Sequence, residues 1–136
     1  MNKKTLEKIL NADLPSSFRQ IHLELARERS HPAGDVAIGY VIVAPLTPDG
    51  TIDAKLWKKH RVACRVVRHR PGEADGVGHL IHQPGGNWAI EYDVSGGIPN
   101  ETGYHFSDEH FVVGEYVSIK EHGQFHTFRV ASVSPL

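Results

Sequence analysis

The histidines of this chain are the side chains with the clearest capacity for chemistry. Ten occur among 136 residues, and three pairs are closely spaced: His79 with His82, His105 with His110, and His122 with His126. Imidazole and carboxylate groups hold zinc or iron when three or four of them converge. If a divalent metal is bound, we expect its ligands to come from His82, His105, His110 and Asp93.

The spacing of the histidines does not by itself bring them together. Residues an odd number of positions apart in a strand point to opposite faces, so His79 and His82 cannot both face inward without a bulge. His122 and His126 sit on either side of an expected tight turn, where cross-strand neighbours meet. Because such turns usually face solvent, exposed or hydrogen-bonded histidines are the alternative to a metal site.

A second group of candidates surrounds the segment Trp88-Ala-Ile-Glu-Tyr-Asp. Strand alternation places Trp88, Ile90 and Tyr92 on one face and Glu91 and Asp93 on the other. Two carboxylates on one face could bind a cation or act as acid and base, but they could equally form the solvated face of a strand. A ligand site at one barrel mouth would then comprise His82, Trp88, Glu91, Tyr92, Asp93, Tyr104 and His105.

Residues 55–70 form a basic segment with seven Lys or Arg side chains around Trp57. Basic surface beside an aromatic ring is one way in which small barrels bind single-stranded nucleic acid. Against this, the net charge of the chain is −1, without the positive excess of a dedicated nucleic-acid protein. Arg61 and Arg65 could simply be outward residues of a strand.

The single cysteine, Cys64, excludes an internal disulfide framework. It lies in an apolar run, where a free thiol usually acts as a small buried hydrophobic group. The sequence contains neither a Gly-x-Ser-x-Gly elbow nor a phosphate-binding glycine loop. It therefore identifies no catalytic residue and predicts no cofactor.

The elements that must position these residues are mostly short strands. Apolar side chains alternate at Ile21, Leu23 and Leu25, and β-branched runs follow at 36–44, 61–70, 111–120 and 125–133. The run 36–44 is apolar enough for a strand covered on both faces, with Gly39 at a bulge or a close backbone approach. Six to eight strands with frequent turns predict an all-β fold, an antiparallel barrel or sandwich.

Two short helices are expected beside the strands. Leu6, Ile9 and Leu10 form one apolar stripe at helical spacing, so residues 1–17 are predicted to be an N-terminal helix and linker. Asp53 is a suitable N-cap for about two further turns. Residues 18–136 would form the barrel, and residues 1–136 a single domain.

Charge is segregated along the chain, with a net charge of +6 in residues 1–70 and −7 in residues 71–136. Both halves carry strand patterns, so we expect them to interleave in one fold and partly compensate each other. No apolar run reaches the length of a membrane span, and no signal-peptide pattern opens the chain. These features predict a soluble cytoplasmic protein without a membrane partner.

The last two expected strands, Phe111-x-x-Gly-Glu-Tyr-Val-Ser-Ile and His126-Thr-Phe-Arg-Val-x-x-Val, look like the closing hairpin of many small barrels. With Gly78-His-Leu-Ile-His and Trp88-x-x-Glu-Tyr-Asp, the chain after Phe18 resembles a family of small bacterial proteins of unknown function. The resemblance implies a barrel-like strand pattern. It carries no activity and therefore no functional residue.

Functions from different classes remain open. The strand pattern without a catalytic motif favours a binding or protein-interaction module, with a protein or small-molecule partner and the option of a homodimer. The alternative is a small enzyme that depends on a metal or on acid–base catalysis through His82, Glu91, Asp93 and His105. A second alternative is single-stranded nucleic-acid binding through residues 55–70.

Overall fold

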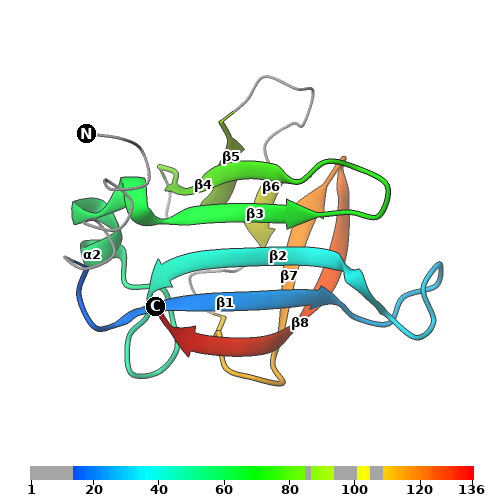
Figure 1. Cartoon of the computed structure of the whole chain (residues 1–136), viewed down its shortest axis with the longest axis horizontal. Helices are drawn as coiled ribbons and strands as arrows, with labels where there is room; N and C mark the ends of the chain where they lie inside the picture. Colours follow the sequence, from blue (N-terminus) through cyan, green and yellow to red (C-terminus); the bar gives the residue numbers. More distant parts are fainter. Residues whose placement is uncertain (1–13, 85–86, 94–100, 105–108) are drawn as a thin grey trace.

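The computed structural model describes residues 14–84, 87–93, 101–104 and 109–136, without the side chains of 102–104. The described residues form eight antiparallel strands that close into a barrel, each beside its neighbours along the chain and β8 beside β1 (Figure 1). The strands are β1 (Phe18–Leu25), β2 (Asp35–Pro45), β3 (Arg65–His69), β4 (Gly76–His82), β5 (Trp88–Tyr92), β6 (Glu101–Tyr104), β7 (Tyr116–Glu121) and β8 (Gln124–Pro135). The all-β prediction is confirmed. The helix expected at the N-terminus falls largely outside the described residues.

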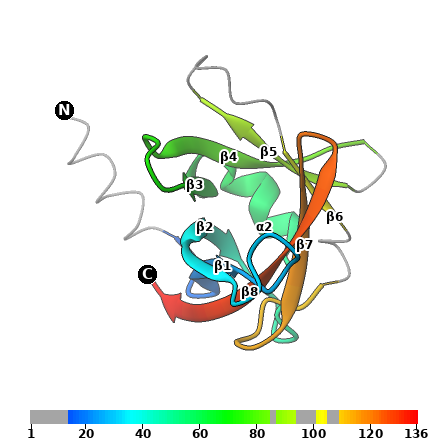
Figure 2. The same ribbon diagram turned by 90° about the vertical axis from the view of Figure 1, so that its right-hand side faces the viewer.

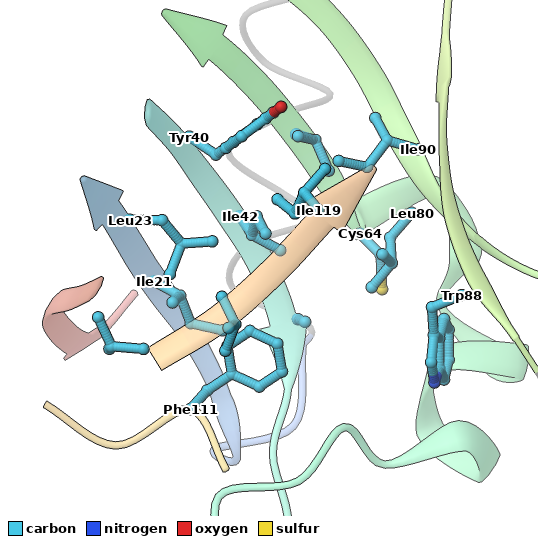
Figure 3. Packing of buried hydrophobic residues seen from close by; sticks show 14 of the residues in the cluster. Ile21, Leu23, Tyr40, Ile42, Cys64, Leu80, Trp88, Ile90, Phe111 and Ile119 are labelled. Carbon is cyan, nitrogen blue, oxygen red and sulfur yellow. The ribbon is translucent and has the colours of Figure 1, made fainter. Parts of the chain in front are cut away.

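The interior of the barrel follows from strand alternation. Ile21, Leu23 and Leu25 point inward from β1 and are almost completely buried, as their period of two predicts. Figure 3 shows inward side chains of several strands packed together along the barrel axis. The core residues with almost no exposed surface include Ile42, Val66, Leu80, Ile90, Ile119 and Phe128 from the strands and Phe111 from the segment before β7.

Strand β2 differs from its expected environment. Tyr40, Ile42 and Ala44 are buried, but Val41 and Val43, which alternate with them, are only partly buried, so the outer face is only partly covered. The predicted close approach at Gly39 is confirmed, because a Cβ atom there would lie 1.9 Å from the carbonyl oxygen of Leu23. The pairing of β1 with β2 shifts register immediately beyond this point.

One barrel end, which we call the helix end, carries α2 (Ala54–Lys59), followed by the 3₁₀ turn η1 (Arg61–Ala63) (Figure 1). Asp53 caps α2 as predicted, accepting the backbone N–H groups of Lys55 and Leu56 at 3.1 Å. The buried Trp57 donates its indole N–H to the carbonyl of Leu80 at 2.8 Å and so fixes α2 to the barrel. The strand expected over 61–70 therefore begins only at Arg65.

The opposite end, which we call the turn end, is formed by the connections β1–β2, β3–β4 and β7–β8 (Figure 2). The last is the predicted tight hairpin, with Glu121 paired to Gln124. His122 and Gly123 form its two-residue turn with φ of 50° and 77°. Within the described ranges, no helix combines the length and apolar character that crossing a membrane requires.

Candidate functional site

The inward side chains change from apolar to polar at the turn end of the barrel. Six residues from five strands and one adjoining loop meet there, and we call them the charged cluster: Tyr40, Arg68, Arg70, Tyr92, Glu101 and Glu121. Strand alternation aims Arg68 inward two residues after the buried Val66. Glu121 likewise lies two residues after the buried Ile119 on β7.

Glu101 is the most deeply buried member of the charged cluster, with 1% of its surface exposed. Its Oε1 accepts the hydroxyl of Tyr40 at 2.9 Å and the hydroxyl of Tyr92. Its Oε2 accepts Nε of Arg68 at 3.2 Å. Three donors therefore compensate the transfer of this carboxylate from water to the barrel interior.

Glu121 lies closer to the opening and accepts two guanidinium groups. Arg68 donates Nη2 to Oε1 at 2.8 Å, and Arg70 donates Nη2 to Oε2 at 2.5 Å. Arg68 thus bridges the two carboxylates, while Arg70 also donates to the hydroxyl of Tyr40 at 3.2 Å. Two positive and two negative charges are balanced within one hydrogen-bonded network.

The two carboxylates respond differently to this environment. Burial raises the pKa of Glu101, and the negative charge of Glu121 adds to that effect over the opposing hydrogen bonds of Tyr92 and Tyr40. Burial also raises the pKa of Glu121, but Arg70 and Arg68 outweigh it and lower the pKa to about 2. Glu121 is therefore a permanent anion at neutral pH.

A cavity of about 170 Å³ lies beside the charged cluster at the turn end. Its apolar walls come from Leu25, Ile38 and Phe128, and Arg70 and Glu121 of the charged cluster also line it. Its remaining lining residues are Glu28, His31 and His126. The cavity thus combines an apolar wall with side chains that can donate and accept hydrogen bonds.

Glu28 fixes the two histidines of the cavity. Its carboxylate lies 3.0 Å from Nδ1 of His126 and 3.2 Å from Nδ1 of His31. The hydrogen bond to His126 is the main reason that the pKa of Glu28 is lowered, so this carboxylate is ionised and only accepts. Nδ1 of each ring therefore directs a proton at Glu28, and Nε2 is the other hydrogen-bonding atom of each ring.

His82 and Trp88 lie far from this cavity, at the helix end. The imidazole of His82 stacks on Trp88 with ring centroids 4.2 Å apart, and Trp57 packs edge-on against both rings. Trp88 is 2% exposed. These rings fill that end of the barrel.

The carboxylates Glu91 and Asp93 are exposed on the outer face of the sheet, as the solvated-face alternative describes. Asp93 accepts Nδ1 of His79 at 2.7 Å, and Glu91 lies opposite His79 in the register of β4 and β5. Tyr92 alternates inward and joins the charged cluster. The structure therefore separates Tyr92 from the two carboxylates that flank it.

The remaining site candidates are Tyr104, His105 and His110. His105 and the side chain of Tyr104 lie outside the described residues. His110 is bonded through Nδ1 to the carbonyl oxygen of Asp49 at 2.6 Å. Among the residues with a described position, no group of three or more His, Cys, Asp or Glu side chains is arranged to hold a metal.

The basic segment 55–70 is divided between two environments. Lys55, Lys58 and Lys59 are exposed on α2, whereas Arg68 turns into the barrel. Trp57, the aromatic ring on which a base would stack, is buried.

Cys64 is buried as expected, and burial raises the pKa of its thiol to about 12.

Sequence reasoning missed Glu28, Arg70, Glu101, Glu121 and His126 as members of one site. Arg68 lies two residues after the apolar Val66, and this alternation is the signal from which its inward position could have been predicted. The partners of Arg68 are 33 and 53 residues away, so their proximity depends on the closed barrel.

Comparison with known proteins adds no relative. No protein-family model, curated protein or solved structure matches this chain. The resemblance to a family of small bacterial proteins stays a prediction, and the function has to be argued from the geometry.

Proposed function

We propose that this protein is a binding module that takes a small polar molecule into the cavity at the turn end. The observation that carries the proposal is the cavity itself, which opens beside a fully paired network of buried charges. If the charged cluster served stability alone, apolar side chains could fill this end of the barrel without a loss of folding free energy.

The cavity restricts the size of the ligand. Its volume of about 170 Å³ is below the range of roughly 300–1,000 Å³ found for drug-sized ligands. At about 30 Å³ per water molecule, it holds the equivalent of roughly six waters. The ligand is therefore a molecule of a few non-hydrogen atoms, or the end group of a longer one.

The lining also indicates the chemistry of the ligand. Both lining carboxylates are already paired, Glu28 with the two histidines and Glu121 with the arginines. A charged ligand would disturb these pairs, whereas a neutral ligand with a hydroxyl or amide group can form hydrogen bonds with the Nε2 atoms of His31 and His126. A small alcohol or amide with a short apolar part meets these requirements.

Ligand-observed NMR with three probe sets tests the proposal: neutral alcohols and amides, carboxylates, and primary amines. We expect the neutral set to give saturation transfer from the natural protein. His126→Phe, which removes a hydrogen-bonding imidazole and fills the cavity, should abolish the transfer. His79→Phe changes a histidine on the outer face and should leave it intact. Absence of binding by every set, or equal binding to His126→Phe, would contradict the proposal.

A further inference from the structure

An apolar groove of about 550 Å³ lies where the start of β1, the loop after β2 and the segment before β7 meet. Leu46, Phe111 and Val133 contribute to its lining, and Val112 and Val113 stand at it with 48% and 58% of their surfaces exposed. Two adjacent half-exposed valines over an apolar depression form a surface that gains free energy when covered.

The edge of this groove also contains a polar atom without a partner. Oγ of Ser17 is buried, and no atom of the described residues forms a hydrogen bond with it. Ser17 lines the groove together with Ser16. A buried hydroxyl without a partner is costly, so a polar group from outside the described residues is expected to approach it.

We propose that the groove is the docking site of the chain's own N-terminal segment, residues 1–13. Leu6, Ile9 and Leu10 provide one apolar stripe at helical spacing, which matches an apolar groove. The described chain begins at Leu14, whose side chain packs against the barrel core, only two residues before Ser16 at the groove edge. The segment is therefore tethered beside the groove at a high effective concentration.

Charge is complementary as well. Lys3, Lys4 and Lys8 lie off the apolar stripe of the segment. Asp49 is exposed between groove-lining residues of the loop after β2, and Glu115 is exposed two positions beyond Val113. The groove also contains Arg19, but its guanidinium is held on the backbone oxygens of Ser16 and Phe18. A basic helix with one apolar face fits an apolar groove with acidic flanks.

Disulfide trapping in the full chain tests this docking. The variant Leu10→Cys with Val113→Cys should form an intramolecular disulfide under mild oxidation, as seen by peptide mass mapping. Native Cys64 does not compete, because it is buried and its thiol is protonated. The control, Leu10→Cys with Val36→Cys, uses an exposed valine at the turn end and should react at least about tenfold more slowly.

Two results would overturn the docking. One is equal trapping in both pairs. The other is a disulfide-linked dimer of the Val113→Cys pair at micromolar concentration, which would assign the groove to a second copy of the chain.

A labelling experiment provides a second readout. In the full chain carrying only Val113→Cys, maleimide labelling should be slow. Adding Leu6→Asp and Leu10→Asp should accelerate it about tenfold or more, because the charged stripe no longer docks. Unchanged labelling would contradict the proposal. None of these variants alters the cavity at the turn end, so failure here leaves the proposed function standing.

Discussion

Arg68 is the residue on which the charged cluster depends. It connects Glu101 and Glu121, which come from different strands, and only 6% of its side chain is exposed. Buried ion pairs add little stability compared with apolar packing, but removing one partner leaves the other charged and desolvated. A single substitution at Arg68 should therefore cost much more than a surface pair.

We expect Arg68→Met to lower the free energy of unfolding by about 3–5 kcal/mol, because the buried Glu101 and the partly buried Glu121 lose their shared cation. Urea denaturation followed by circular dichroism measures the loss. The matched control is Arg129→Met, whose half-exposed guanidinium lies 3.6 Å from Glu24 and should cost no more than about 1 kcal/mol. Similar losses in the two variants would show that the cluster is not the stabilising network described above.

Glu109 gives the stability a pH dependence. Burial raises its pKa to about 7 from an ordinary value of 4.5, despite a backbone hydrogen bond from Ser118. Since the folded state holds this proton more tightly, its contribution to stability is complete below pH 4.5 and is lost as the pH rises through 7. Glu109→Gln should therefore be more stable than the natural protein at pH 8 but not at pH 4.5. Urea denaturation at both values checks this, and a constant difference would contradict it.

At the scale of elements, the β7–β8 hairpin is fixed by its two turn residues. His122 and Gly123 both have positive φ, as a type I′ turn requires. His122→Asn should stabilise the protein by a few tenths of a kcal/mol, because asparagine tolerates the left-handed region better. Gly123→Ala should destabilise it by about 1–2 kcal/mol. Thermal unfolding measures both, and equal melting temperatures would show that the turn does not control this hairpin.

The strands also show how much of the fold could be predicted from the sequence. The period of two was sufficient for the inner faces of β1 and β5, because it reports directly which side chains meet the core. It overestimated the coverage of β2, since β-branched residues are favourable on an outer face as well. It also started β3 too early, because the short turn η1 contains the same residue types as a strand.

The candidate site could not be predicted in the same way. Glu101 begins β6 after a long loop pattern, and its tyrosine partners on β2 and β5 are fixed only by barrel closure. The distance of 3.0 Å between Glu28 and His126 joins residues 98 positions apart. Local patterns show which face of a strand a side chain occupies, but they do not show which strands become neighbours. His82 and Tyr92 were therefore predicted at the same mouth of the barrel, although they lie at opposite ends.

At the scale of the molecule, the segregated charges attract the two halves of the chain to each other. Residues 1–70 contribute β1 to β3 and residues 71–136 contribute β4 to β8, and the two halves meet along β3–β4 and β1–β8. Each half alone would be an open sheet with its apolar face in water. The opposite net charges of the halves should accelerate their association.

Separately produced fragments 1–70 and 71–136 test this. We expect neither fragment to form a cooperative β-structure alone, and their mixture to recover the circular dichroism spectrum of the intact chain. The association rate should fall as salt is raised, because screening weakens the attraction between +6 and −7. The halves form two contiguous parts of the barrel and do not interleave. Folding of either fragment by itself, or a rate independent of salt, would contradict their dependence on each other.

Closure of the barrel has a consequence for how other chains can approach it. Within the described ranges, every strand is hydrogen-bonded to a neighbour on each side. Some peptides bind by adding a strand to the edge of a sheet, and they need a row of free amide and carbonyl groups there. A closed barrel has no such edge. Neighbouring copies in a crowded solution likewise find no template for fibril formation, unless two neighbouring strands first come apart.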